Sequence, residues 1–346
     1  MRKPVSDTVI VRRPAKPSNW LAAVAAARAW LFLIVLVLGF EIWAEVSFGA
    51  SFIGNVFNLR SIAVFTVAPL LLAIGQTFVI ISGGIDLSVG FTMGLAAIVL
   101  SHAVNAATPV LGTGGGLIAG ILAAVLAAMV PGVVNGLLIA RLRVPPFIGT
   151  LGMFGVARGV AFLLAGGTTV PVSNAALNYI GNGTLAGVPV IVLLTLAALL
   201  LLHYLLSQTR FGQYTYAIGG NRAAAVRAGI NVRRVTVLLY VLSAVCAGVG
   251  GILYTGRFSA GAAQAGEPLL LDSIAAVVIG GASLFGGSGT IVGTLIGALI
   301  VAVIQYGLVF INVEPFWQFV AVGVVIIISV LVDQSQRRLG GGRVDE

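Results

Sequence analysis

Long apolar runs alternate with short polar or glycine-rich breaks along almost the whole chain. Ten of these runs predict membrane-spanning helices, because each approaches the roughly 20 residues that a helix needs to cross the hydrocarbon core. We place the spans at 29–48, 61–81, 89–106, 116–140, 147–165, 188–207, 235–256, 270–285, 290–309 and 316–333. The pattern predicts an all-α integral membrane protein with a single transmembrane domain over 29–333, in which the eighth span is the shortest.

Basic residues are distributed unevenly between the two sides of this pattern. Most of the 19 lysines and arginines fall in an N-terminal segment at 1–28, a loop at about 208–234 and a tail at 334–346. The positive-inside rule places these three segments in the cytoplasm. We therefore expect a multi-pass protein of the bacterial cytoplasmic (inner) membrane with both termini inside.

The composition indicates that lipid is the main solvent of this chain. Charged residues make up 8% of it and hydrophobic residues 59%, whereas a soluble domain carries roughly 25% charged residues. The net charge of +9 follows the membrane pattern, so we expect no nucleic-acid partner. Cys246 is the single cysteine and the two histidines lie far apart, so no metal site is expected.

Motifs that carry enzyme chemistry do not occur in the sequence. It contains no GxxxxGK[ST] phosphate loop, no HExxH zinc motif and no GxSxG nucleophile motif. We expect the chain to bind no cofactor and to be no enzyme.

The segment AIGGNRAAAVRAGI at 217–230 predicts a short helix within the basic loop. Gly219 and Gly220 interrupt the preceding structure, and Asn221 is a good N-cap for a helix over 222–228. Gly229 suits the left-handed position that ends a helix. A helix at the inner face suggests docking of a soluble partner, and an ordinary surface turn is the alternative. The residues assigned to docking are Gly219, Gly220, Asn221, Arg222, Ala225, Arg227 and Gly229.

Two glycine-rich breaks, SGGIDLSVG at 82–90 and IGGASLFGGSGT at 279–290, each join one apolar run to the next. Their likeness suggests a weak internal repeat of two halves, which many transporters have. Small-residue runs elsewhere permit close helix packing.

Several polar residues stand in or beside the apolar runs. Asp86 either caps a helix starting at Leu87 or serves as a proton, cation or sugar-hydroxyl site. Arg158 needs a partner, either a structural one such as Asp86 or a helix end, or a substrate. Asp272 at the start of the eighth span complements the helix dipole. The set assigned to a translocation path or a structural pivot is Asp86, Ser88, Asn135, Arg158, Asp272, Gly280 and Gly281.

Four long motifs occur in an order that resembles one family. They are SGGIDLSVG at 82–90, VPPFIGTLGM at 144–153 followed by ARG at 157–159, YAIGGNRAAAVRAGINVRRV at 216–235, and LLLDSIAAVVIGGASLFGGSGTIVGTLIGALI at 269–300. The chain resembles the membrane permease subunits of ABC importers for ribose, galactose, xylose and related monosaccharides. It departs from them at Arg222, where a glutamate is usual, at Leu270, where an acid is usual, and at Ser288, where an arginine is usual.

The resemblance implies a permease that translocates a monosaccharide or related polyol by alternating access. Its implied partners are a cytoplasmic ATP-binding subunit that carries ATP and Mg²⁺, an external solute-binding protein, and a second permease copy or paralogue in the lipid membrane. The helix at 222–228 would be the coupling helix, and the loops at 166–187 and 258–269 would receive the binding protein. On the residues alone, an ion-coupled secondary transporter that uses Asp86 remains the alternative.

Overall fold

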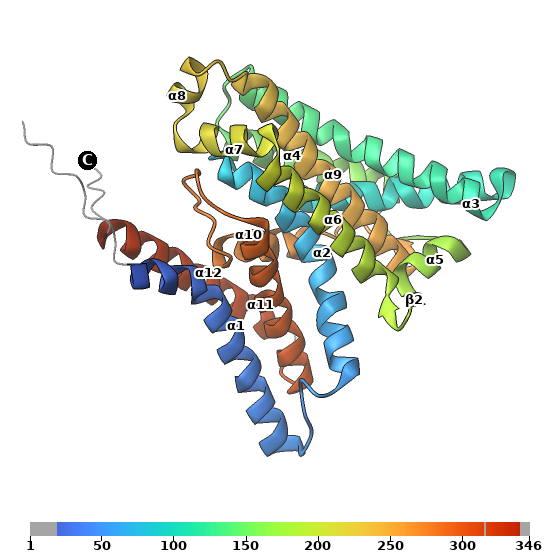
Figure 1. Ribbon diagram of the computed structural model, residues 1–346. Coiled ribbons are helices and arrows are strands. Elements are labelled where there is room, and N and C mark those ends of the chain that lie inside the picture. The colour runs from blue at the N-terminus through green and yellow to red at the C-terminus, as the bar shows by residue number, and fades with distance from the viewer. Residues whose placement is uncertain (1–18, 315, 340–346) are drawn as a thin grey trace, which may run out of the picture.

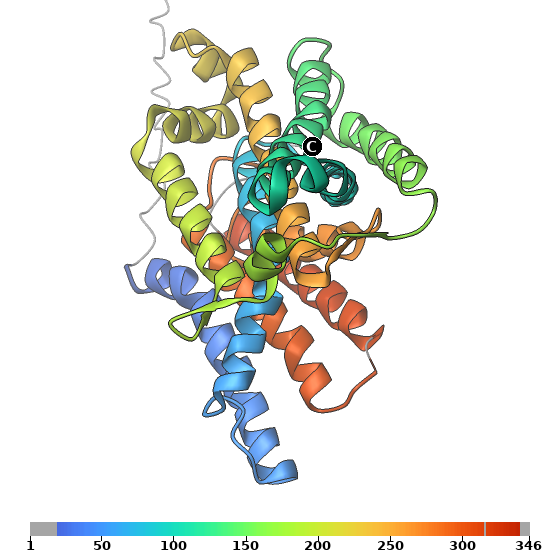
Figure 2. The ribbon, with the colours of Figure 1, turned by 90° about the vertical axis from the view of Figure 1, so that its right-hand side faces the viewer.

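The computed structural model describes residues 19–314 and 316–339, which form a helical bundle with two small two-stranded ribbons (Figure 1, Figure 2). Most of the predicted basic segment at 1–28 and the end of the tail at 334–346 lie outside the described residues. The elements in chain order are α1 (Asn19–Phe48), α2 (Val56–Ile81), α3 (Val89–Ala140), α4 (Pro146–Ala165), β1 (Val170–Pro171), α5 (Ala175–Asn182), β2 (Thr184–Leu185), β3 (Val188–Pro189), α6 (Val190–Gln208), α7 (Arg210–Gly220), α8 (Arg222–Arg227), α9 (Val232–Phe258), β4 (Ala260–Gly261), α10 (Glu267–Ile279), α11 (Ile291–Phe310) and α12 (Phe316–Leu339).

Seven helices within the described residues are long and apolar enough to cross a membrane: α1, α2, α3, α4, α6, α9 and α11. The predicted all-α membrane fold is confirmed. α12 has a shorter apolar stretch, Phe316–Leu331, and α10 is shorter still. The predicted total of ten spans therefore stays a prediction.

α3 contains two of the predicted spans. Its backbone leaves the helical conformation at Gly112, where φ is 71° and ψ is 177°. Beyond this kink the chain folds back on itself, so that Gly116 lies against Thr108 and Gly120 lies against Val104. Figure 1 shows the turn of this hairpin at the right-hand edge of the molecule. α3 is thus a pair of antiparallel helices, as the separate runs at 89–106 and 116–140 indicate.

α10 differs from the predicted span at 270–285. It begins at Glu267 and ends at Ile279, and the residues from 280 to 290 form an irregular loop. The end is fixed at Gly281, whose φ of +90° a helix cannot continue. Apolar residues continue after Ile279, so the hydrophobic pattern extended the predicted span to residue 285. The predicted end of this helix is wrong.

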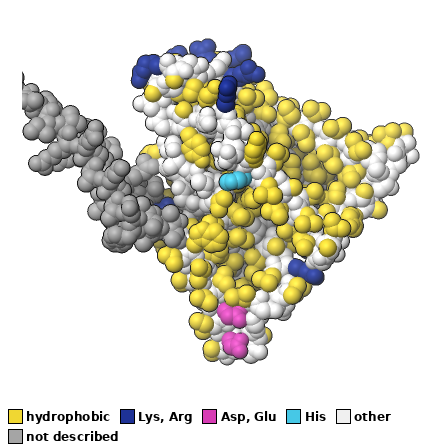
Figure 3. All heavy atoms as spheres, viewed as in Figure 1, with side chains coloured by type: hydrophobic (Ala, Val, Ile, Leu, Met, Phe, Trp, Pro, Cys, Tyr) yellow, Lys and Arg dark blue, Asp and Glu magenta, His cyan; other side chains and the backbone are white. Residues whose placement is uncertain are grey.

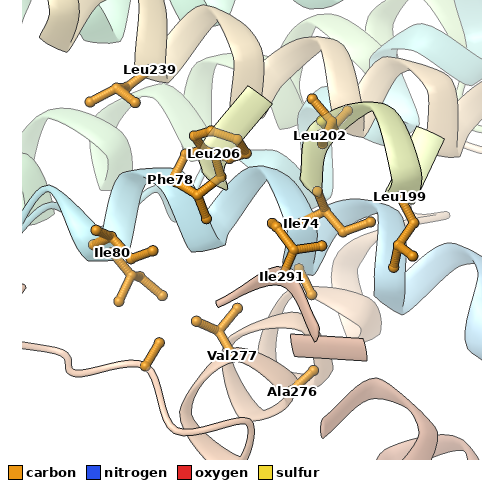
Figure 4. Close-up of a cluster of buried hydrophobic side chains, with 14 of the residues drawn as sticks. Ile74, Phe78, Ile80, Leu199, Leu202, Leu206, Leu239, Ala276, Val277 and Ile291 are labelled. Atoms are coloured by element: carbon orange, nitrogen blue, oxygen red, sulfur yellow. The ribbon is translucent and has the colours of Figure 1, made fainter. Parts of the chain in front are cut away.

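α2 is the central helix of the bundle. All its residues from Pro69 to Ile81 are buried, and it packs against α6, α9, α10 and α11. Figure 4 shows Ile74, Phe78 and Ile80 of α2 among apolar side chains from these four helices. This burial on all sides explains why the sequence of α2 is a nearly continuous apolar run and lacks the polar face of an amphipathic helix.

The two ends of the molecule differ in charge. Arginine side chains gather over α7 and α8 at one end, and acidic side chains lie at the opposite end, where α1 ends (Figure 3). The positive-inside rule makes the first the cytoplasmic end. At the other end β1 pairs with β4, with Val170 opposite Gly261, which joins the loop after α4 to the loop after α9. We call this the outer end.

Candidate coupling helix and transport cavity

α8 has the local structure that its sequence predicts. The Asn221 side chain accepts a hydrogen bond of 2.9 Å from the Ala224 amide, and Gly229 takes a φ of +81° just beyond the helix. Ala225 is buried, whereas the other five residues of α8 are exposed. α8 ends one residue before the predicted Ala228. It is an exposed, capped helix at the cytoplasmic end.

The end of α7, which leads into α8, lies on the end of α2, just before the first glycine-rich break, and on the second break. A Cβ atom at Gly219 would stand 1.7 Å from the Ile81 carbonyl oxygen and 2.6 Å from the Gly287 amide. The Gly287 amide itself donates a 2.8 Å hydrogen bond to the Ile81 carbonyl. Only glycine fits such a backbone approach. Segments far apart in the sequence thus meet at one point.

Tyr216 adds a side-chain link between α7 and the second break. Its hydroxyl donates a hydrogen bond of 2.7 Å to the Gly289 carbonyl. Partial burial raises the pKa of the Tyr216 hydroxyl, which keeps it a neutral donor. Gly286 completes the junction, because its backbone passes close to Gly83 in the first break. The predicted internal repeat stays untested, but its two candidate breaks lie side by side.

Asp86 is fully buried in the first break. One of its carboxylate oxygens accepts hydrogen bonds from the Ser88 amide at 3.0 Å and the Ser88 hydroxyl at 2.6 Å. Asn135 donates to the Ser88 hydroxyl at 2.9 Å. The predicted helix start at Leu87 is wrong, because α3 begins at Val89 and Ser88 takes the N-cap position. Asp86 therefore closes the turn before the helix.

Residues from two other helices surround this turn. Gln76 of α2 donates to the Asp86 backbone carbonyl at 2.5 Å, and Tyr240 of α9 donates to the Ile85 carbonyl at 3.4 Å. Ser243 lies beside the carboxylate. Tyr240 and Ser243 were not identified from the sequence as candidate site residues. Their spacing of three residues, which places two polar side chains on one face of an apolar helix, could have indicated them. The second Asp86 oxygen has no hydrogen-bond partner among the described residues.

A cavity of about 1040 Å³ lies between α2, α9, α10, α11 and α12. It begins beneath the outer end, where Arg257 and Glu267 line it, and reaches inward to Asp272 and Gln305. Gln305 donates a 2.8 Å hydrogen bond to the Asp272 carboxylate. Asp272 does not begin its helix as predicted, since α10 starts five residues earlier at Glu267. Asp272 is instead a buried polar residue in the cavity wall.

The remaining candidates of the proposed path lie elsewhere. Arg158 is exposed on α4, where its guanidinium lies 5.3 Å from the ring centre of Phe91, and it makes no ion pair with Asp86 or any other described residue. A Cβ atom at Gly280 would meet the Gly293 carbonyl at 2.3 Å, so Gly280 permits close approach of α11. The structure thus joins Asp86, Ser88 and Asn135 by hydrogen bonds in which Asp272 and Arg158 take no part.

Comparison with known proteins agrees with a membrane transport subunit. Residues 58–330 match the family described as the permease component of the branched-chain amino acid transport system. The ribose import permease protein RbsC of Bacillus subtilis is 44% identical over 271 residues, which cover 77% of this chain and 81% of the relative. RbsC of Escherichia coli K12 is 37% identical, with 90% of this chain and 96% of the relative covered.

The fructose import permease protein FrcC of Rhizobium meliloti is 36% identical and covers 89% of this chain, with 85% of its own length matched. The family match spans most of the chain and includes α8, both breaks and the cavity. This multi-pass protein of the bacterial inner membrane belongs to the family of permease components of the branched-chain amino acid transport system.

Proposed function

We propose that this chain is the transmembrane subunit of a binding-protein-dependent, ATP-driven importer of a monosaccharide or a related polyol. Relatives named as ribose and fructose import permeases, at 44% and 36% identity, support a sugar. The chain itself breaks no bond, and ATP and Mg²⁺ belong to a separate cytoplasmic ATP-binding subunit. Transport proceeds by alternating access of the cavity to the two sides.

The backbone contact of Gly219 with Ile81 and Gly287 is the observation that carries this proposal. A partner that moves α8 also moves the end of α7. Because no side chain separates Gly219 from α2 and from the loop at 280–290, that movement passes directly to the helices that line the cavity. Close-packed interiors transmit such displacements. The contact supports α8 as the coupling helix.

The cavity wall has the chemistry that a sugar needs. Asp272 and Gln305 offer hydrogen-bonding groups at its inner part, and Glu267 and Gln264 do so nearer the outer end. Tyr254 is among its aromatic residues. Carboxylates and amides bind hydroxyl groups, and aromatic faces pack against the apolar face of a sugar ring. A few polar groups in an apolar wall favour weak, reversible contacts.

The outer end offers one continuous surface for an external solute-binding protein. The loops at 166–187 and 258–269 are joined through β1 and β4. Asn182 also accepts a 2.6 Å hydrogen bond from the Arg257 guanidinium, and Asn178 donates to the Ser259 hydroxyl at 3.1 Å. These contacts support the proposal that both loops receive the binding protein together.

A second permease copy or a paralogue completes the transporter. Gly152, Gly155 and Gly159 form an open strip on α4, beside the exposed Arg158. An arginine facing lipid at the middle of a helix costs about 2.5–3.5 kcal/mol on insertion scales, whereas small residues permit close helix packing. Both features favour protein rather than lipid against this face.

The ion-coupled alternative requires a carboxylate that meets the transported solute. Asp86 is the candidate, but it does not belong to the described residues that line the cavity. Its hydrogen bonds hold the turn of the first break instead. This separation favours the ATP-driven importer.

Gly229→Val tests the coupling role of α8. The left-handed φ of +81° is strained for a β-branched residue by roughly 1–2 kcal/mol, so α8 loses its ending. We expect ATP hydrolysis by the reconstituted complex to continue while sugar uptake falls at least tenfold. Gly229→Asn is the matched control, because asparagine tolerates this conformation. Equal uptake by the two variants would refute the role.

A further inference from the structure

A second cavity, of about 720 Å³, lies at the cytoplasmic end between the end of α3, the start of α4 and the segment from α8 into α9. Arg143 enters it from the α3–α4 connection, Arg222 from α8 and Arg233 from the first turn of α9. We call this cavity the arginine pocket. Three sequence segments therefore each contribute an arginine to the wall of one cavity.

The arginine pocket carries no compensating negative charge. None of the described residues that line it is acidic, and no hydrogen bond or ion pair to its three arginine side chains occurs within the described part of the chain. Like charges gathered at one site repel one another. Arg143 also holds a left-handed backbone, with a φ of +58°, which costs roughly 1 kcal/mol for a residue other than glycine. Such an arrangement fits an anion that spans the three cations.

The walls and the surroundings of the arginine pocket are apolar. Val144, Val226 and Ile230 line it, and Phe147 and Ile148, just after it, are 52% and 57% exposed at the start of the membrane helix α4. Ile148 shares the face of the glycine strip on α4, whereas Phe147 lies off that strip, where an exposed apolar residue suits acyl chains. The arginine pocket therefore stands at the level where lipid phosphates meet the cytoplasm.

The two arginines of α8 point to different sides. Arg222 and Val226, one helical turn apart, line the arginine pocket, whereas Arg227 does not line it. Residues three or four apart share a helix face, so Ala223 and Arg227 share a neighbouring face, about 100° around the helix from Arg222 and Val226. That face stays available for a protein partner when the arginine pocket is filled.

We propose that the arginine pocket binds the phosphate of an anionic phospholipid of the inner leaflet, with the three guanidinium groups on the phosphate and the apolar wall on the upper acyl chains. Basic pockets between membrane helices on the cytoplasmic side recognise such head groups. The bound lipid ties α8 to the connection between α3 and α4. This site is separate from the transport cavity and does not depend on the identity of the solute.

The test compares the full-length protein in nanodiscs of phosphatidylcholine with and without phosphatidylglycerol. Native mass spectrometry counts the phosphatidylglycerol molecules retained after exchange into mild detergent, and thermal unfolding reports the apparent affinity. The pocket variant is Arg143→Gln with Arg222→Gln and Arg233→Gln. The matched control, Arg141→Gln with Arg210→Gln and Arg234→Gln, removes the same charge from exposed cytoplasmic arginines outside the arginine pocket. If the triple variant does not fold, Arg143→Gln alone replaces it in the test, because this substitution leaves α8 and α9 unchanged.

We expect the wild type to retain phosphatidylglycerol and the pocket variant to bind it on the order of tenfold or more weakly, since each arginine near a charged surface contributes about a fivefold factor. The control variant should stay within about twofold of the wild type. If both triple variants lose phosphatidylglycerol binding equally, the lipid is attracted by the overall positive charge of the cytoplasmic face, and the proposed site would be overturned. Stabilisation by inorganic phosphate alone would identify a soluble anion instead. Unchanged lipid binding with loss of the ATP-binding subunit would assign the arginine pocket to an acidic protein segment.

Discussion

Asp86 acts through one carboxylate oxygen, which holds the turn that leads into α3. Its donors are the Ser88 amide and hydroxyl, and Asn135 supports the same hydroxyl. A carboxylate at membrane depth could be singled out from the sequence because of its cost. Its surroundings could not, because Asn135 and Ser243 stand far from Asp86 in the sequence, on helix segments whose rotation depends on packing.

Asp86→Leu and Asp86→Asn should separate these roles. Leucine removes the acceptor and leaves buried donors unsatisfied, so we expect the free energy of unfolding to fall by roughly 3 kcal/mol. Asparagine keeps one oxygen and should cost about 1 kcal/mol. Thermal unfolding in detergent measures both. Uptake per folded Asp86→Asn transporter should remain driven by ATP. If uptake instead depends on an ion gradient and the substitution abolishes it, the protein is a secondary transporter.

Asp272 is predicted to meet the solute in the cavity. Asp272→Asn keeps an oxygen for the Gln305 amide, so the fold should remain, but the charge that strengthens hydrogen bonds to sugar hydroxyls is lost. We expect uptake to fall about tenfold, because a hydrogen bond to a charged group is worth roughly 1.5–3 kcal/mol. Affinity of the isolated binding protein for sugar is the internal control. Unchanged uptake would remove Asp272 from the path.

At the scale of elements, the short segment from α7 to α8 controls more of the molecule than its length suggests. Asn221 and Gly229 predict the ends of α8 because capping is a local property. The contact of Gly219 with Ile81 is not local, and no periodicity in the sequence indicates it. The early end of α10 was missed for the same reason, since Gly281 adopts its conformation within a loop packed on other segments.

Gly219→Ala tests the junction at the end of α7. The added methyl group would meet the Ile81 carbonyl and the Gly287 amide, and overpacking of this kind costs about 1–3 kcal/mol. We expect lower thermal stability and weaker coupling of ATP hydrolysis to uptake. At Gly220 the same methyl group meets no described atom within 4 Å, so Gly220→Ala should lose less in both assays. The reverse order would contradict the proposed junction.

At the scale of the whole molecule, hydropathy and arginine distribution predict most of the architecture. Apolar runs locate the membrane helices, including the two arms of α3, because burial in lipid demands length and apolar composition. They do not reveal that Asp272 and Gln305 share a cavity with α2 and α12, or that Arg158 lies over the Phe91 ring rather than pairing with Asp86. Those facts depend on helix rotation, which side-chain packing decides.

The most direct test of the central claim is purification of the full chain from its native host in mild detergent, followed by quantitative mass spectrometry. The account predicts a co-purifying ATP-binding protein, in a stoichiometry of about one for each permease copy as expected for a closed two-fold assembly. Its amount should fall with Arg227→Glu on the outward face of α8. A protein that purifies alone and still moves solute into vesicles under an ion gradient would contradict the account.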